Sequence, residues 1–337
     1  MSDPFEQQPH DAFGVIKPDD DPYSADDPAF LTDSDASSST QSLSSSVLNY
    51  QYENGRRYHA YREGEYIMPN DEQEQDRMDL HHYICRLVVG GALFRAPVRL
   101  ERSPRILDLG TGTGIWAIEM ADEYPSADVT GNDLSPIQPG WVPPNCFFEV
   151  NDCESSWDYS KPFTFIHARS LGGSVRDYAK LFERSLQNLE NGGWVEFADF
   201  AIDFFSDDNT LEIAPNLVKW PKLLNEASVK FGKHLNIAED CKQWMINAGL
   251  KNVRQEVYKV PVNPWAKDPK LKELGRYHQV NMLEGMESYS LALFIRVLGW
   301  TPEEVQAFLA GVRQELVDRS IHAYTKLYFN YGQKVDE

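Results

Sequence analysis

Alternate glycines that follow a carboxylate are the residues of this chain best suited to hold a nucleotide. The sequence PRILDLGTGTGIWAIE at residues 104–119 places Asp108 ahead of Gly110, Gly112 and Gly114. An apolar run before these glycines and a helical pattern after them predict a strand, a tight turn and a helix. Such a turn could hold a dinucleotide, a nucleoside triphosphate or a ligand without a phosphate.

The spacing within this turn disfavours a phosphate ligand. In the dinucleotide fingerprint GxGxxG, a third glycine lets helix and strand pack closely beneath a pyrophosphate. This chain has Ile115 at that position, and the P-loop pattern GxxxxGK[ST] occurs nowhere in it. The carboxylate of Asp108 would repel a pyrophosphate but would attract the ammonium group of S-adenosylmethionine. We therefore expect that cofactor, and a nicotinamide oxidoreductase is the less favoured interpretation.

Acids also follow the next two apolar runs. Asp133 ends VTGND and can accept hydrogen bonds from both ribose hydroxyls, although NAD enzymes use an acid at the same place. Asp152, in FFEVNDCE, can accept from the adenine amino group while the next backbone N–H reads the ring. Each acid alone could simply cap a turn, but three at the ends of successive strands predict a cofactor cleft. The residues predicted to contact the cofactor are Asp108, Gly110, Thr111, Gly112, Asp133, Leu134, Asp152 and Cys153.

The methyl acceptor would meet the cofactor near the end of the fourth strand, where the sequence reads FIHARSLGG. His167 is the candidate general base; it could also contact the cofactor or serve only to hold the backbone. Arg169 could bind a carboxylate of cofactor or substrate, or tie down its own loop. Tyr58 and Tyr61, in YHAYREGEY, could close over the cofactor's amino-acid end, line the acceptor pocket or form a packed aromatic clasp. No metal site is indicated.

The elements that would position these residues alternate between short apolar strands and helical patterns, which is typical of a parallel sheet covered by helices. A helix is expected at 71–90, with one ring of the pair His81 and His82 in the core and the other in solvent. A break is expected near Gly285 in the long helical region, and Thr301 is the expected cap of the last helix. The expected strands are 105–109, 128–132, 146–150, 163–168, 194–200, 253–260 and 321–331, and the expected helices are 71–90, 115–124, 175–189, 211–231, 237–248, 271–298 and a helix after 301.

The composition narrows the classes of partner. The chain has 337 residues, with Lys+Arg 32 against Asp+Glu 52, for a net charge of −20. This excess of acid argues against direct binding of nucleic acid, which is driven by clustered cations. The four cysteines form no CxxC pair, no apolar run reaches the roughly 18 residues of a membrane helix, and the acidic start does not resemble a signal peptide. We expect a soluble cytoplasmic or nuclear protein that is neither secreted nor membrane-bound.

Longer stretches of the sequence resemble the LaeA-like methyltransferases of filamentous fungi, a group of class I S-adenosylmethionine-dependent methyltransferases. The resemblance covers residues 47–334. It is carried by ENGRRYHAY (53–61), MPNDEQEQDRMDLHH (68–82), DLGTGTGIWAIE (108–119), DLSPIQPGWVPPNCFFEVND (133–152), FIHARSLGGSVRDY (165–178), VPVNPWAKDPKLKELG (260–275), LALFIRVLGWTPEEVQAFLAGVRQEL (291–316) and IHAYTKLYFNYGQK (321–334).

The resemblance implies a doubly wound α/β fold with a mostly parallel, seven-stranded Rossmann-like sheet whose last strand is antiparallel. Residues 47–334 would form the methyltransferase domain. Residues 1–46, rich in Asp, Ser and Pro, would be a disordered tail because they have too few apolar groups to offset the entropy of ordering. The expected parts of the domain are an N-terminal helical cap (47–100), a cofactor-binding core (101–260), a helical insertion (261–320) and the last strand (321–334).

Two functions remain open for such a protein. The first is an enzyme that methylates oxygen or nitrogen of a fungal secondary metabolite, or of its peptide or polyketide precursor. The alternative is a regulatory methyltransferase subunit of a velvet-type complex, with a protein partner on the helical insertion or the acidic tail. No Asn/Asp-Pro-Pro-Tyr motif follows the fourth strand, which argues against the usual methylation of nucleic-acid bases.

Overall fold

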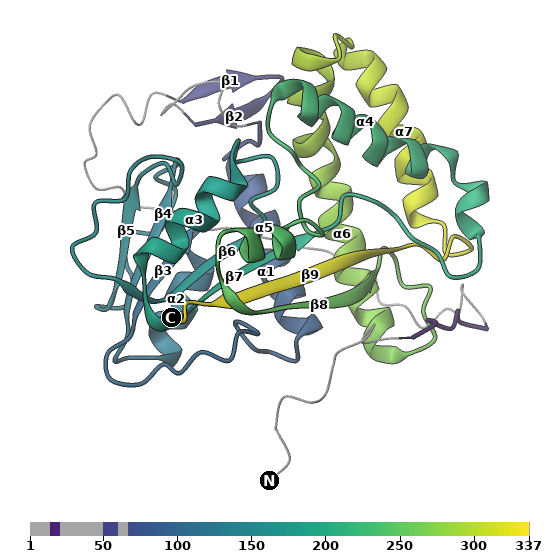
Figure 1. Ribbon diagram of the computed structural model, residues 1–337. Coiled ribbons are helices and arrows are strands. Elements are labelled where there is room, and N and C mark those ends of the chain that lie inside the picture. The colour runs from purple at the N-terminus through teal and green to yellow at the C-terminus, as the bar shows by residue number, and fades with distance from the viewer. Residues whose placement is uncertain (1–13, 21–49, 60–66, 337) are drawn as a thin grey trace.

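A seven-stranded sheet forms the centre of the molecule in the computed structural model, which describes residues 14–20, 50–59 and 67–336 (Figure 1). The strand order is β5-β4-β3-β6-β7-β9-β8. β9 is antiparallel to both of its neighbours, and all the other paired strands are parallel. The predicted fold class is confirmed. The strands are β3 (Arg105–Leu109), β4 (Asp128–Asp133), β5 (Cys146–Val150), β6 (Phe163–Arg169), β7 (Leu189–Phe200), β8 (Lys251–Pro261) and β9 (Tyr324–Gln333).

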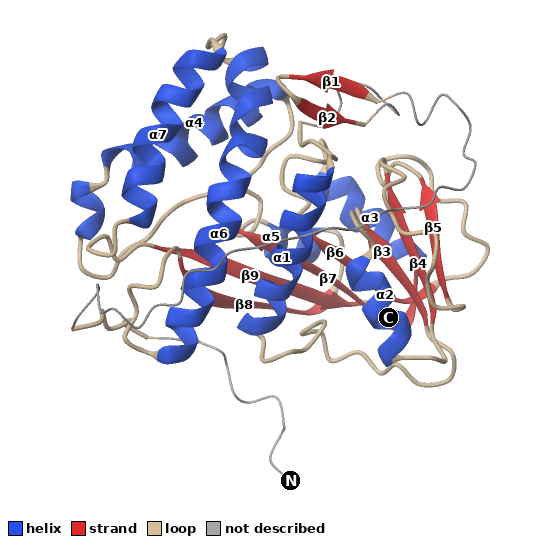
Figure 2. Ribbon diagram, turned by 180° about the vertical axis from the view of Figure 1, so that it is seen from behind, coloured by secondary structure: helices blue, strands red, loops and turns tan. Residues whose placement is uncertain are grey.

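Helices cover both faces of this sheet. Figure 1 shows α3 (Tyr178–Asn188) and α5 (Cys241–Asn247) on one face. Figure 2 shows α1 (Glu72–Val88), α2 (Ile115–Glu123) and α6 (Pro269–Ala292) on the other. The central strands are therefore buried on both sides, as their continuous apolar runs require.

A helical layer stands beside the sheet and packs on α6. It consists of α4 (Pro215–Phe231), preceded by a 3₁₀ turn at Thr210–Ile213, and α7 (Pro302–Val317). Apolar side chains from these helices form a core of their own with the segment that leads into α1. Thr301 caps α7 as predicted, in a capping box with Glu304. A short antiparallel hairpin of β1 (Gln51–Glu53) and β2 (Arg56–Tyr58) precedes α1 in the sequence.

The predicted break in the long helix is misplaced. α6 runs through Gly285 without interruption, and the irregularity lies at the π-helical turn Leu293–Val297. A single glycine inside a helix costs only about 1 kcal/mol relative to alanine. Here the missing side chain lets α1 approach, because a Cβ on Gly285 would lie 3.3 Å from Cδ of Arg77.

The structure also differs from the expected disorder of residues 1–46, in the part of that segment that is described. Residues 14–20 lie against the start of the insertion, where Pro18 forms an antiparallel bridge with Ala266. Ile16 is buried, and Asp19 forms an ion pair with Lys272. A single apolar anchor and local charge complementarity order these residues, and composition averaged over the whole tail hides both. Within the described parts of the chain, none of the helices has the length and apolar character needed to cross a bilayer.

Candidate functional site

A cavity of about 380 Å³ opens at the carboxyl ends of β3, β4, β5 and β6, the edge at which open α/β sheets bind ligands. All eight residues predicted to contact the cofactor line this cavity, as do His167 and Arg169. The ends of β3, β4 and β5 thus bring together residues that lie up to 45 positions apart in the sequence, from Asp108 to Cys153. Their contact with the cofactor remains a prediction.

The glycine turn between β3 and α2 can be built only without side chains. Gly110, Gly112 and Gly114 have φ of +63°, +59° and +83°, a region that other residues rarely adopt. A Cβ on Gly110 would lie 2.5 Å from Leu171, and one on Gly114 would lie 2.4 Å from the ring of Phe148. The turn is therefore packed tightly against Leu171 and Phe148, and side chains at Gly110 and Gly114 would not fit.

Hydrogen bonds fix the turn to the ends of β3 and β4. The Thr111 hydroxyl donates to Oδ2 of Asp108 at 2.6 Å. The backbone N–H of Gly112 donates to Oδ2 of Asp133 at 2.8 Å. The backbone N–H of Gly110 donates to the side-chain oxygen of Asn132 at 3.3 Å. The glycine turn is thus held in place by Asp108 and Asp133, two of the acids predicted to contact the cofactor.

Asp108 uses its second oxygen on the candidate base. Its Oδ1 lies 2.7 Å from Nδ1 of His167, and both side chains are buried. The His167 ring stacks on Trp116 with centroids 3.7 Å apart and an interplanar angle of 4°. Burial lowers the pKa of His167, although the hydrogen bond to the carboxylate of Asp108 opposes the shift. The ring is thus held by a side chain and not by the backbone, and its role as general base or cofactor contact stays a prediction.

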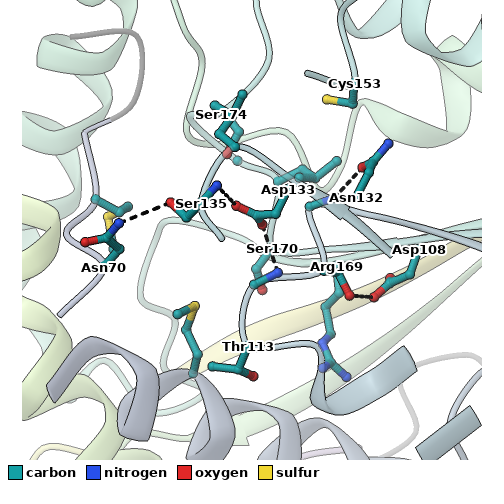
Figure 3. A pocket seen from close by; sticks show the side chains of 18 of the residues that line it. Asn70, Asp108, Thr113, Asn132, Asp133, Ser135, Cys153, Arg169, Ser170 and Ser174 are labelled. Carbon is teal, nitrogen blue, oxygen red and sulfur yellow. Dashed lines mark hydrogen bonds between the residues drawn. The ribbon is translucent and has the colours of Figure 1, made fainter. Parts of the chain in front are cut away.

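Asp133 is set at the cavity wall with each oxygen oriented by a backbone N–H. Gly112 donates to Oδ2, and Ser135 donates to Oδ1 at 2.9 Å. Figure 3 shows this link continuing from the hydroxyl of Ser135 to the amide of Asn70, 3.3 Å away. Burial raises the pKa of Asp133 to about 6, against the lowering effect of the two N–H donors. The remaining lone pairs of the carboxylate are available to a ribose.

The turn after β5 supplies the third acid. Oδ1 of Asp152 accepts the backbone N–H of Glu154 at 2.8 Å. The carbonyl of Cys153 accepts from the indole of Trp157 at 3.0 Å and from Arg184 at 2.7 Å. Burial raises the pKa of the Cys153 thiol to about 12, so that this thiol is a poor nucleophile.

Arg169 is tied to α1. Its guanidinium donates to Nδ1 of His82 at 2.7 Å, and Nε2 of His82 lies 2.8 Å from Glu119. Burial and the nearby Arg169 lower the pKa of His82 to about 4, so its neutral ring bridges the two charges. Figure 3 shows the Arg169 side chain pointing away from Asp133. These bonds join the end of β6 to α1, and the binding of a carboxylate by Arg169 stays a prediction.

Tyr58 does not line the cavity. Its ring is buried in the core of the helical layer, with the guanidinium of Arg296 5.2 Å from the ring centroid. This is the packed aromatic clasp that the sequence left open as an alternative. Tyr61 lies outside the described residues.

Comparison with known proteins identifies the family. The family described as "Methyltransferase domain" matches residues 79–255, just over half of the chain. The chain is 43% identical over 301 residues to methyltransferase pytC of Aspergillus terreus, covering 89% of this chain and 93% of that protein. The chain belongs to the S-adenosylmethionine-dependent methyltransferases. The resemblance and the cofactor expected from the sequence are thereby confirmed.

Two further relatives of this methyltransferase carry other names. Secondary metabolism regulator LAE1 of Cochliobolus heterostrophus is 39% identical over 286 residues, which is 83% of this chain and 93% of that protein. Protein-methionine methyltransferase laeA of Emericella nidulans is 35% identical over 289 residues, or 85% and 76% of the two chains.

Several cavity residues of the methyltransferase escaped the sequence analysis. His81 and His82 are both buried, so the expectation that one ring faces solvent is wrong. α6 covers this side of α1, and that contact has no local signal in the sequence. Asp199 is the last residue but one of β7 and lines the cavity, and its signal in the sequence is the same as that of Asp108, an acid near the end of an apolar strand. Further lining residues are Asn70, Glu74, Arg77, His81, Asp199 and Tyr289.

Proposed function

We propose that this methyltransferase transfers a methyl group to an oxygen or nitrogen of a small organic molecule of fungal secondary metabolism. The observation that carries the proposal is the wall of the cavity beyond the end of β6. There Ile202, Leu235 and Tyr289 stand beside His81 and Asp199, which gives an apolar lining with a few converging polar groups. Small-molecule sites have this composition, and a volume of about 380 Å³ lies within their usual range of roughly 300–1,000 Å³.

The residues present fit S-adenosylmethionine at the other end of the cavity. The glycine turn, Asp133 and Asp152 line the same end of the cavity, so a turn without side chains and two carboxylates face one space. Among the described residues, the buried amide nitrogen of Asn132 has no hydrogen-bond partner. Asp133 would accept the ribose hydroxyls, and Asp152 with the backbone of Cys153 would hold the adenine. When bound, the cofactor supplies a methyl group carried on a positively charged sulfur. The chain's task is then to position the acceptor and to remove its proton.

A regulatory methyltransferase that acts on a protein is the second candidate, and the similarity to LAE1 and laeA favours it. A partner of such a subunit would meet the helical insertion or the acidic tail. We infer a cytoplasmic or nuclear location for either function, and no direct contact with nucleic acid.

One labelling experiment separates the two candidates. The full chain is incubated with S-adenosylmethionine carrying a tritiated methyl group, once with a small-molecule extract of a fungal culture and once with the protein fraction of that culture. We expect label in the small-molecule extract, and the Asp133→Ala variant should not produce it. Label that enters only protein, the chain itself included, would contradict the proposal and support the second candidate.

A further inference from the structure

A second cavity of about 70 Å³ adjoins the first, between the end of β7 and helices α4 and α6. The two cavities share part of their wall, so that a molecule in one would touch the same side chains as a molecule in the other. The residues common to both are His81, Ser170, Asp199, Ile202 and Tyr289. Ser170, Asp199 and Ile202 of this shared wall lie at the ends of β6 and β7, while His81 belongs to α1 and Tyr289 to α6. The wall thus adjoins the strand end where a methyl acceptor would meet the cofactor.

Two buried imidazoles on the second cavity each have a nitrogen without a partner. Nε2 of His81 lies 2.8 Å from the hydroxyl of Ser170, and Nε2 of His278 lies 3.0 Å from that of Thr325. Among the described residues, Nδ1 of His81 and Nδ1 of His278 have no hydrogen-bond partner. A buried polar atom left unpaired is unfavourable. Both histidines line the second cavity, so its wall has hydrogen-bonding capacity that the described part of the chain does not use.

Asp199 stands on the shared wall with its carboxylate held in one orientation. Oδ2 accepts the backbone N–H of Gly172, and Oδ1 accepts the backbone N–H of Phe200, both at 2.9 Å. Each oxygen keeps a lone pair beyond these bonds. Burial raises the pKa of Asp199 to about 7, which suits a group that takes up a proton near neutral pH.

Apart from Asp203 and Asn281, the rest of the second cavity is lined mainly by apolar side chains. Its wall includes Phe204 from the segment after β7, Trp220, Pro221 and Leu224 from α4, and Met282 from α6. The indole N–H of Trp220 is already used, since it donates to Ser290. A ligand that fills this space must therefore be mainly hydrocarbon, with its polar atoms at the end that faces Asp199 and the two histidines.

We propose that the methyl acceptor, a mainly apolar molecule with one hydroxyl or amine, lies at the wall that the two cavities share and places only a small apolar end in the second cavity, whose volume is about 70 Å³, and that Asp199 receives the proton this group loses. This inference rests on the proposed function. The oxygen or nitrogen of the acceptor forms a bond to the methyl carbon, and the carbon–sulfur bond breaks with its electron pair on sulfur, leaving a neutral thioether. The proton of the acceptor passes to a carboxylate oxygen of Asp199. Asp199 is thus assigned as the catalytic base in place of His167.

The first test is binding, measured by calorimetry on the chain saturated with S-adenosylhomocysteine. The probe is 4-propylphenol, and propylbenzene is its matched partner without the hydroxyl. We expect 4-propylphenol to bind at least tenfold more tightly than propylbenzene. Leu224→Phe and Met282→Phe, which fill the cavity from opposite walls, should each weaken its binding at least tenfold. Val229→Phe is the control, because Val229 lies on the exposed side of α4. Affinity for S-adenosylhomocysteine verifies that each variant is folded.

The second test is Asp199→Asn, a variant that keeps the shape of the side chain. We expect its affinity for S-adenosylhomocysteine to stay within threefold of wild type, while methyl transfer to the small-molecule extract falls at least 100-fold. Unchanged transfer would overturn the role of Asp199. Absence of 4-propylphenol binding, or binding that the two cavity-filling variants leave unchanged, would overturn the pocket. If the probe binds as expected but wild type labels only protein, the pocket stands and the proposed function fails.

Discussion

Asp108 and His167 lie opposite each other on the neighbouring parallel strands β3 and β6, and a hydrogen bond of 2.7 Å joins Oδ1 of Asp108 to Nδ1 of His167. With Thr111 on its other oxygen, Asp108 connects the glycine turn to the end of β6. Asp108, which the sequence predicted to attract a ligand's ammonium group, therefore also connects two structural elements. The same hydrogen bond fixes the ring of His167, the candidate base, against the wall of the cavity.

Two substitutions of His167 distinguish a structural role of its side chain from a role in proton transfer. His167→Ala removes the stack on Trp116 and the partner of Oδ1 of the buried Asp108, whose Oδ2 keeps the bond from Thr111, so the free energy of unfolding should fall by about 2–4 kcal/mol. His167→Asn keeps an N–H directed at Asp108, and it should retain most S-adenosylhomocysteine affinity and methyl transfer. Urea unfolding measures the free energy of unfolding, and calorimetry measures the affinity for S-adenosylhomocysteine. A folded His167→Asn variant that binds normally but transfers 100-fold more slowly would restore His167 as the base.

Asp133 should dominate the affinity for the cofactor product. Asp133→Ala removes an acceptor that is worth about 1.5–3 kcal/mol when charged, so the dissociation constant of S-adenosylhomocysteine should rise roughly 10- to 150-fold. Because the pKa of Asp133 is about 6, wild-type affinity should also weaken as the pH falls below 6. Calorimetry at several pH values tests this, with the exposed Asp122→Ala as control. An unchanged dissociation constant for Asp133→Ala would show that the ribose lies elsewhere.

Gly114→Ala should destabilise the turn for two reasons. Its φ of +83° disfavours a side chain, and the new Cβ would lie 2.4 Å from Phe148. We expect a loss of about 1–3 kcal/mol in the free energy of unfolding, measured by urea denaturation. Phe148→Leu combined with Gly114→Ala should restore the unfolding free energy lost to the clash with Phe148, but not the part lost to the unfavourable φ. Gly140→Ala, with nothing within 4 Å of the new Cβ, should be nearly neutral.

Glu196 gives the fold a pH-dependent stability. It lies on β7 and accepts backbone N–H groups of Arg95 and Ala96 with one oxygen, while Oε1 has no partner. Burial raises its pKa to about 8. The raised pKa favours folding fully below the usual value of 4.5, and this contribution is lost as the pH rises through 8.

Glu196→Gln should therefore flatten the fall in melting temperature between pH 5 and pH 8. Other buried groups give slopes of their own, because the pKa values of Asp133 and Asp199 are raised and that of His82 is lowered. These contributions are the same in wild type and variant, so the difference between the two slopes reports Glu196. Scanning calorimetry at matched ionic strength measures it. Identical slopes for the two proteins would contradict the assignment.

The sequence predicted the sheet well because each central strand is a short apolar run bounded by turns. The strand that carries Asp108 and the one that precedes Asp152 were placed to the residue. Errors fell where a contact between distant elements decides the outcome. Arg77 of α1 packs beside Gly285, and Tyr58 is buried beneath the helical insertion. No periodicity within one element signals such contacts.

The central claim is that the glycine turn and the acids of β3, β4 and β5 hold S-adenosylmethionine and not a dinucleotide. Calorimetric titration of the wild-type chain with S-adenosylhomocysteine and, separately, with NAD tests it most directly. We predict one S-adenosylhomocysteine per chain, displaced by S-adenosylmethionine, and no binding of NAD. Binding of NAD without binding of S-adenosylhomocysteine would contradict the account.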